Sequence, residues 1–297
     1  MKRPTKAVIA AAGFGTRFLP QTKAMPKEML PLIDKPIIQY VVEELVEAGI
    51  KDIIIVGSVN KRSIEDHFDA PSADLMANLE AGGPKKQPYI DEINAVSSLA
   101  NFAFVRQKGP YGNATPLLCA AHLIGRDEPF VYTWADDFFV SDPGRTTQMI
   151  RTHEQYGGSV LACKKIKEDA EYDRYGVAAG ESIDDLTIQV SHIDEKPGKA
   201  NAQSDLASVS GYLLVPEMLE YIESAAEAYV GGGEFMIQPI MQQMIDEGHK
   251  FFAREIADGT YYDTGDKLEY LKTTMDFGLN HPELGPALAD YLKTRLK

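Results

Sequence analysis

The chain has 297 residues, of which 44% are hydrophobic, and its 44 acidic against 30 basic side chains give a formal net charge of −14. A chain of this length and hydrophobic content can bury the core of one large domain and is expected to be a soluble globular protein. The negative charge argues against a nucleic-acid partner, because phosphate backbones are held by basic surfaces.

The two cysteines and the short apolar run near the start of the chain bear on the compartment in which the protein is expected. Cys119 and Cys163 are the only cysteines, each in an apolar segment, so two reduced, buried thiols are expected rather than a disulfide. The apolar run at residues 8–12 is too short for a secretory signal. Since no other stretch could span a bilayer, we expect a cytoplasmic protein with no membrane partner.

The first predicted element is a buried strand at residues 8–12, which ends in a glycine turn. Gly13 and Gly15 let backbone amides approach a phosphate closely, and Arg17 and Lys27 can bring positive charge to the same oxygens. This segment predicts a site for a nucleoside triphosphate.

Two better-known phosphate loops do not fit this segment. The run GFGTRF is not followed by GKS or GKT, as a Walker loop requires. Phe18 stands where the dinucleotide fingerprint needs a third small residue. A nicotinamide-dependent oxidoreductase is therefore a weak alternative.

Strand and helix signals then alternate. Residues 36–48 have apolar spacing and a helical start, Gly49 stands at the expected C-terminal cap, and residues 52–56 form a second buried strand. The same order recurs in a strand at 102–105, a helix at 117–123 and a strand at 130–135. We expect an α/β fold with a doubly wound, mixed but mostly parallel sheet, in which ligands bind at the carboxyl ends of the strands. Gly13 and Asp136 both fall at such ends.

The remaining segments are less regular. Residues 70–88 are rich in Pro, Gly, Ala and Ser and indicate a surface insertion with room for a short helix. Further strands are expected at 160–166, 187–193 and 207–215, and helices at 216–226, 236–247, 267–277 and 286–296. Six apolar residues near the end could pack on the core or form a subunit contact: Leu268, Leu271, Met275, Leu288, Leu292 and Leu296.

Acidic residues follow two of the apolar segments. Asp136 and Asp137 end one strand, and Asp263 follows Tyr261 and Tyr262. Carboxylates suit Mg²⁺, which commonly combines one or two of them with substrate phosphates. Paired acids at a strand end are, however, more often solvated or used as helix caps.

The runs GxGTRxLP, TK, PKEMLP, DKP and IQYxVEE together resemble the bacterial UTP:glucose-1-phosphate uridylyltransferases, which are sugar-1-phosphate nucleotidyltransferases. Later landmarks extend the similarity through nearly the whole chain: Arg106-Gln107, Ala135-Asp136-Asp137, Tyr175-Gly176-Val177, Glu195-Lys196-Pro197 and Asp263-Thr264-Gly265. The resemblance implies an enzyme with a Rossmann-like nucleotidyltransferase fold, which transfers the uridylyl group of UTP to glucose 1-phosphate. The products would be UDP-glucose and pyrophosphate, and the cofactor Mg²⁺.

The resemblance also implies an organisation for the chain. We expect one nucleotidyltransferase domain with a nucleotide-binding half at 1–158, a sugar-phosphate-binding half at 159–266 and C-terminal helices at 267–297. We expect it to assemble as a homodimer or homotetramer.

Site roles follow by matching the family's motifs. The catalytic cations would be Arg17, Lys27 and Lys196. The nucleotide would be held by Ala11, Ala12, Gly13, Gly15, Thr16, Glu28, Gln107 and Gly112. The sugar would be held by Gly176, Glu195 and Gly211, and the metal by Asp136 and Asp263. A carboxamide such as that of Gln107 can serve both the donor and the acceptors of uracil.

Two runs depart from the family pattern. The family's GLGHA is replaced by Gly112-Asn113-Ala114-Thr115-Pro116, and its GEIQLTDAI by the run from Gly233 to Ile240, GEFMIQPI. Because both departures fall beside the expected base and sugar sites, a thymidylyltransferase or another sugar-1-phosphate nucleotidyltransferase is an alternative. A non-catalytic nucleotide-sugar sensor is a second alternative, although a pure binder would not need the whole set of cations and acids.

Overall fold

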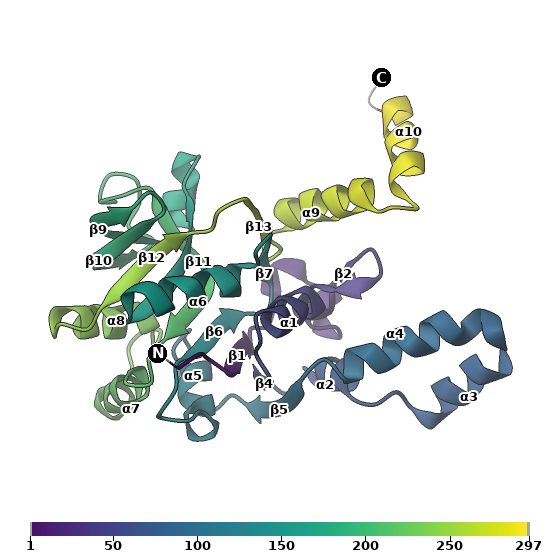
Figure 1. The fold of residues 1–297 in the computed structure, drawn as a ribbon, viewed down its shortest axis with the longest axis horizontal. Coiled ribbons are helices and arrows are strands. Elements are labelled where there is room, and N and C mark those ends of the chain that lie inside the picture. Colours follow the sequence, from purple (N-terminus) through teal and green to yellow (C-terminus); the bar gives the residue numbers. More distant parts are fainter. Residues whose placement is uncertain (1, 296–297) are drawn as a thin grey trace.

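The computed structural model describes residues 2–295 and is dominated by one nine-stranded sheet (Figure 1). Its strand order is β5-β4-β1-β6-β11-β8-β12-β10-β9. In chain order the strands are β1 (Lys6–Ala11), β4 (Asp52–Gly57), β5 (Asn101–Arg106), β6 (Phe130–Trp134), β8 (Ser159–Lys165), β9 (Gly176–Asp184), β10 (Thr187–Glu195), β11 (Leu206–Leu214) and β12 (Phe251–Glu255).

The strand directions confirm the mixed, mostly parallel sheet. β5, β4, β1 and β6 are parallel neighbours, and β8 is parallel to β12. β11 is antiparallel to β6, β8 and β9, and β10 is antiparallel to β12 and β9. Of the nine strands of this sheet, therefore, β11 and β10 run in one direction and the other seven in the opposite direction.

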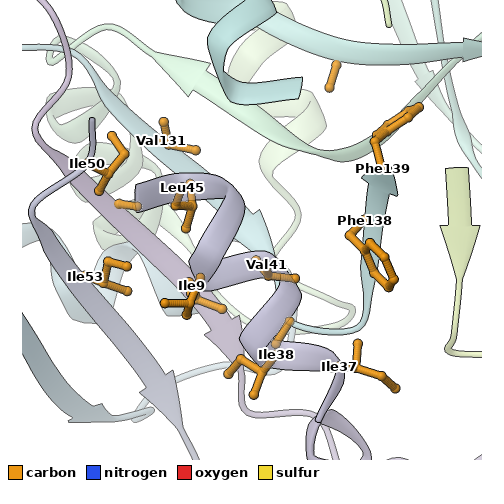
Figure 2. Close-up of a cluster of buried hydrophobic side chains, with 14 of the residues drawn as sticks. Ile9, Ile37, Ile38, Val41, Leu45, Ile50, Ile53, Val131, Phe138 and Phe139 are labelled. Carbon is orange, nitrogen blue, oxygen red and sulfur yellow. The ribbon is translucent and has the colours of Figure 1, made fainter. Parts of the chain in front are cut away.

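Helices cover both faces of the sheet, as a doubly wound fold requires. Neighbouring strand residues point to opposite faces, so Val8 and Ile9 belong to different hydrophobic clusters. Ile9 packs with Val41 of α1 (Ile37–Glu47), as Figure 2 shows, and with Met149 of α6 (Arg145–Tyr156). The opposite cluster contains residues of α5 (Thr115–Ala120), α7 (Met218–Ala228) and α8 (Ile237–Asp246).

A small second sheet brings distant acids together. β7 (Asp137–Ser141) pairs antiparallel with β13 (Gly259–Asp263), and the register places Asp263 opposite Asp137. The acids predicted at the ends of separate strands therefore lie at one rim. A further short pair, β2 (Pro31–Leu32) and β3 (Lys35–Pro36), precedes α1.

The insertion at 70–88 contains more structure than its composition indicated. It leads from α2 (Arg62–Phe68) into α3 (Ala73–Ala81) and α4 (Gln87–Ser97), which project from the body as an arm (Figure 1). α3 buries none of its residues, so it has no strong apolar face that a sequence pattern could have revealed.

The two C-terminal helices are confirmed as α9 (Lys267–Asn280) and α10 (Gly285–Arg295), and they extend away from the sheet (Figure 1). Core packing was the wrong alternative for Leu268 and Leu271, which are 58% and 62% exposed. Tyr270 and Phe277 contact the core instead. Leu296 lies outside the described residues. No helix within 2–295 is long and apolar enough to cross a membrane.

A buried arginine fastens α6 to the sheet. Arg145 is 1% exposed and donates to Glu44 Oε2 of α1 at 2.9 Å and to Ser210 Oγ of β11 at 2.6 Å. It also donates to the carbonyl oxygen of Ser210. Ser210 has a positive φ of 62° and lies where the register of β11 shifts. Arg145 therefore holds an irregular part of the strand in place.

We expect Arg145→Leu to lower the free energy of unfolding by about 3 to 5 kcal/mol, because it leaves Glu44 as an uncompensated and largely buried charge. Urea unfolding followed by circular dichroism measures the change. Arg151→Leu, at an exposed position of the same helix, is the matched control and should change stability by less than about 0.5 kcal/mol. Equal effects of the two substitutions would contradict this account of Arg145.

Candidate active site

A first cavity lies beyond the end of β1. It is lined by six of the predicted nucleotide-site and catalytic residues: Ala12, Gly13, Lys27, Glu28, Gln107 and Gly112. Three other predicted residues support it without lining it. Ala11 is buried in the strand, and Gly15 and Thr16 form the loop, which the Thr22 hydroxyl closes by donating to the carbonyl oxygen of Gly15 at 2.7 Å.

A second cavity collects the residues predicted for the sugar phosphate. Its lining includes Arg17, Gly176, Glu195, Lys196, Gly211 and Asp263. Asp136 lines both cavities, together with Asn113, Trp134 and Glu234. Two ligands bound in the two cavities would therefore meet at Asp136.

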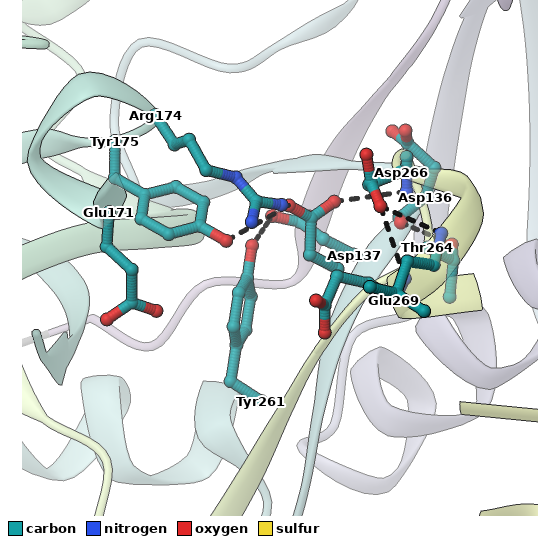
Figure 3. Close-up of polar contacts among 12 residues, drawn as sticks. Asp136, Asp137, Glu171, Arg174, Tyr175, Tyr261, Thr264, Asp266 and Glu269 are labelled. Carbon is teal, nitrogen blue, oxygen red and sulfur yellow. Dashed lines mark hydrogen bonds and ion pairs between the residues drawn. The ribbon is translucent and has the colours of Figure 1, made fainter. Parts of the chain in front are cut away.

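Asp136 and Asp263 converge on one point above Gly265. A Cβ atom built on Gly265 would lie 3.0 Å from Asp136 Oδ2 and 3.2 Å from Asp263 Oδ1. Thr264 N donates to the carbonyl oxygen of Asp136 at 3.1 Å, which ties the D-x-G turn to the strand end (Figure 3). Glycine leaves this cradle between the carboxylates open.

The donor set of the cradle fits a magnesium site completed by substrate. In residues 2–295 no cluster of three or more His, Cys, Asp or Glu side chains has metal-site geometry. Mg²⁺ does not need one, since it is usually bound by one or two carboxylates together with phosphates and water. Asp136 and Asp263 supply the two carboxylates.

Each of these carboxylates also has a cationic partner. Lys27 Nζ forms an ion pair with Asp136, and Arg174 donates to Asp263 Oδ2 at 2.8 Å. Tyr175 donates its hydroxyl to the same oxygen at 3.0 Å. Burial lowers the pKa of Lys27, but Asp136 and Glu28 outweigh that effect, so the pKa is raised and the side chain stays cationic.

Glu28, predicted at the base or ribose, is paired inside the protein. It is 0% exposed and accepts from Lys61 Nζ at 2.7 and 2.9 Å. Burial raises the pKa of Glu28 and lowers that of Lys61, while each partner opposes the shift of the other. No pattern along the chain indicated that Lys61 would be this partner, because it lies far from Glu28 in the sequence.

The altered loop keeps the backbone geometry it needs. Gly112 has a φ of 147°, and a Cβ there would lie 2.1 Å from the carbonyl oxygen of Phe235, so only glycine fits. Ala114 has a φ of −82°, which any residue can adopt. The replacement of the family's second glycine by Ala114 therefore causes no strain.

On the sugar side, Glu195 is held by a neighbour that the sequence did not identify. Gln238 Nε2 donates to Glu195 Oε2 at 2.7 Å, and Lys196 Nζ lies 3.5 Å from Glu195 Oε1. Burial raises the pKa of Glu195, and Lys196 partly offsets the rise. A Cβ on Gly176 would lie 3.2 Å from Glu195 Oε2, so the glycine lets the carboxylate approach closely.

Sequence reasoning also missed the aromatic wall between the cavities. Trp134 is the chain's only tryptophan, and its ring centroid lies 5.1 Å from those of both Tyr132 and Tyr212. Trp134 directly precedes the Ala-Asp-Asp run at a strand end, and this position could have indicated that it lies beside the site.

Asp137, the second acid of the pair, is buried beneath the cradle. Its Oδ2 accepts from the Tyr261 hydroxyl at 2.8 Å and from Ser210 N at 3.2 Å. Its Oδ1 has no hydrogen-bond partner among the described residues. Burial, with a smaller contribution from the negative charges of Asp136 and Asp263, raises the pKa of Asp137 to about 7.

Comparison with known proteins shows that this chain is similar to nucleotidyl transferases over nearly its whole length. Residues 6–278 match the family described as nucleotidyl transferase. A UTP–glucose-1-phosphate uridylyltransferase of Bacillus subtilis is 41% identical over 99% of this chain and 97% of its own length. A protein of that name from Staphylococcus epidermidis is 39% identical over 99% of both chains.

Two solved structures agree. UDP-glucose pyrophosphorylase in complex with UDP-glucose superposes with a TM-score of 0.80 at 33% identity, covering 92% of this chain and 98% of its own. A UTP-bound enzyme of the same kind from Acinetobacter baumannii gives a TM-score of 0.83 at 30% identity, covering 97% of this chain and 98% of its own.

The raised pKa of Asp137 predicts a stability that falls as pH rises. Between the ordinary value of 3.8 and about 7 the native protein binds more protons than the unfolded chain, so the free energy of unfolding should decrease by about 1 kcal/mol per pH unit in this window. Asp137→Asn should remove this contribution. Urea unfolding at pH 5, 6, 7 and 8 in the presence of a chelator measures it.

Asp173→Asn, which neutralises an exposed acid, is the control for this pH series and should leave the slope as in the wild type. If Asp137→Asn and the wild type gave parallel curves, Asp137 would titrate at its ordinary value.

Proposed function

Since the chain belongs to the nucleotidyl transferase family, we propose that it transfers the uridylyl group of UTP to glucose 1-phosphate, giving UDP-glucose and pyrophosphate. The observation that carries this proposal is the meeting of two cavities at Asp136, since the reaction must bring two anionic substrates together. The names of the relatives favour UTP and glucose 1-phosphate over other pairs.

In the proposed reaction, a phosphate oxygen of glucose 1-phosphate attacks the α-phosphorus of UTP. The new P–O bond forms as the bond from the α-phosphorus to the bridging oxygen breaks, and pyrophosphate leaves with that oxygen. The protein forms no covalent bond, so positioning and charge stabilisation supply the catalysis.

The first cavity is proposed to hold UTP. The backbone from Ala11 to Thr16 would face the phosphates, Gln107 and Gly112 the base, and Glu28 would support the cavity from beneath. Lys27 is already fixed at the junction by its ion pair with Asp136, so its charge is available to the triphosphate without reorganisation.

The second cavity is proposed to hold glucose 1-phosphate. Lys196, 54% exposed at the cavity wall, would orient the attacking phosphate, while Glu195 would accept from sugar hydroxyls. Gly176 and Gly211 would let the sugar approach the backbone. Arg17 lines this cavity and donates to the carbonyl oxygen of Gly265 at 3.0 Å, so its charge lies close to the junction.

Asp136 and Asp263 are proposed to hold Mg²⁺ in the cradle above Gly265. When bound, the ion would neutralise phosphate charge and align the two substrates. Lys27 and Arg174 would remain beside the same carboxylates and limit the repulsion between them.

The assembly is proposed to be a homodimer or homotetramer. Leu268, Leu271 and Met275 are exposed on α9, outside the contacts that this helix makes with the core, and support a subunit contact there.

The function is tested by pyrophosphate release from UTP or dTTP, each with glucose 1-phosphate, galactose 1-phosphate or no sugar, and each repeated with a chelator. We expect release only with UTP, glucose 1-phosphate and Mg²⁺. Release with dTTP in place of UTP would support a thymidylyltransferase. No release from folded protein that binds UDP-glucose would support a sensor.

Gly265→Ala tests the cradle. The new methyl group would lie 3.0 Å from Asp136 Oδ2 and 3.2 Å from Asp263 Oδ1, so the carboxylates would be displaced, and kcat should fall roughly 100-fold. Steady-state pyrophosphate release measures the loss. Gly233→Ala is the matched control, since no atom lies within 4 Å of its Cβ position, and it should keep wild-type turnover. Full activity of Gly265→Ala would show that the cradle is not used.

A further inference from the structure

A chain of side-chain amides connects the two cavities. Asn113, in the altered loop beside Gly112, accepts at Oδ1 from the backbone N–H of Ile237 at 2.8 Å. Its Nδ2 donates to Gln238 Oε1 at 3.2 Å. Gln238 Nε2 then donates to Glu195 Oε2 at 2.7 Å. The relay begins at the nucleotide-side loop and ends at the carboxylate of the sugar cavity.

One backbone donor fixes the direction of every bond in this relay. Ile237 N can only donate, so the atom of Asn113 that faces it is the amide oxygen. The Asn113 nitrogen must then face the Gln238 oxygen, and the Gln238 nitrogen must face Glu195. Both amides are therefore oriented by hydrogen bonding, and Glu195 is presented with a donor rather than an acceptor.

The backbone around the relay is also fixed. Phe235 N donates to the carbonyl oxygen of Tyr111 at 2.7 Å, and Ala114 N donates to the carbonyl oxygen of Phe235 at 3.0 Å. These two bonds tie the loop at 111–114 to the segment that begins α8. Gln238 itself is 6% exposed, and buried polar side chains of this kind are normally held by hydrogen bonds.

The two departures from the family pattern supply the two amides. Asn113 stands where the run GLGHA has a leucine, and Gln238 lies in the run that replaces GEIQLTDAI. A leucine could not accept from Ile237 N or donate to Gln238. The two replacements thus form one hydrogen-bonded unit, although they are far apart in the sequence.

We propose that Gln238 is a positioning residue for Glu195, and that it thereby determines how tightly the enzyme binds the sugar phosphate. The inference rests on the proposed function, in which Glu195 accepts from sugar hydroxyls. Lys196 Nζ lies 3.5 Å from Glu195 Oε1 in the same cavity, so it is a cation that can compete for the carboxylate. Without the Gln238 donor, the carboxylate turns toward this lysine and away from the sugar.

The test uses Gln238→Met, which keeps the length of the side chain and removes both polar atoms. We expect KM for glucose 1-phosphate to rise about tenfold, with kcat and the KM for UTP within about twofold of wild type, because the lost interaction binds the sugar in ground and transition states alike. Gln243→Met, on the same helix, is the matched control, because the Gln243 side chain donates to Glu247 and, among residues 2–295, has no hydrogen bond to the cavity. Thermal unfolding of each variant checks that it folds. If Gln238→Met does not fold, KM for glucose 1-phosphate is measured in Gln238→Ala instead.

A double-mutant cycle separates positioning from general loosening of the structure. In a Glu195→Ala background, adding Gln238→Met should change KM for glucose 1-phosphate by less than about twofold, because its target is already gone. An undiminished tenfold effect in that background would overturn the proposal, as would an unchanged KM in the single variant. An inactive wild type would instead overturn the proposed function, and this inference with it.

Discussion

The arrangement of the candidate site depends on compensating the negative charges of acidic side chains that lie close together. A protein of net charge −14 gathers Asp136, Asp137 and Asp263 at one rim, where two anionic substrates are proposed to meet. Such a cluster is stable only if the charge of each acid is compensated by a cation or removed by protonation. Asp136 is paired with Lys27, Asp263 with Arg174, and Asp137 is buried where protonation is favoured. In the proposed reaction the same cations would also be close to the phosphate oxygens.

The sheet supplies the rigidity that this charge cluster needs. The antiparallel pairing of β7 with β13 fixes Asp263 opposite Asp137, and the buried Arg145 fastens β11 at Ser210, whose backbone N–H contacts Asp137. These supports come from strands and helices rather than from loops, and they hold the carboxylates in place without any bound ligand. The loop after β1, by contrast, has only short 3₁₀ turns.

Most of the parallel half of the fold could be predicted, because buried strands and capped helices leave strong periodic patterns, as at β1, α1 and β4. The predicted acids and most of the predicted glycines line two adjoining cavities, as their positions after strand ends indicated. The hydrogen-bond and ion-pair partners of the site residues could not be predicted. The Lys61–Glu28 pair and the Gln238–Glu195 bond join residues whose approach depends on the folded loops, and neither leaves a pattern along the chain. The α3–α4 arm was underestimated because it buries so few apolar residues.

The position of Trp134 has a practical consequence. As the chain's single indole, between two tyrosines and in the wall shared by both cavities, it is the only source of tryptophan emission in the protein. Excitation at its absorption edge therefore reports on one place, without background from elsewhere in the chain. Because Trp134 lines both cavities, we expect ligand binding in either one to change its emission, which stopped-flow mixing can follow with no label and no coupled enzyme.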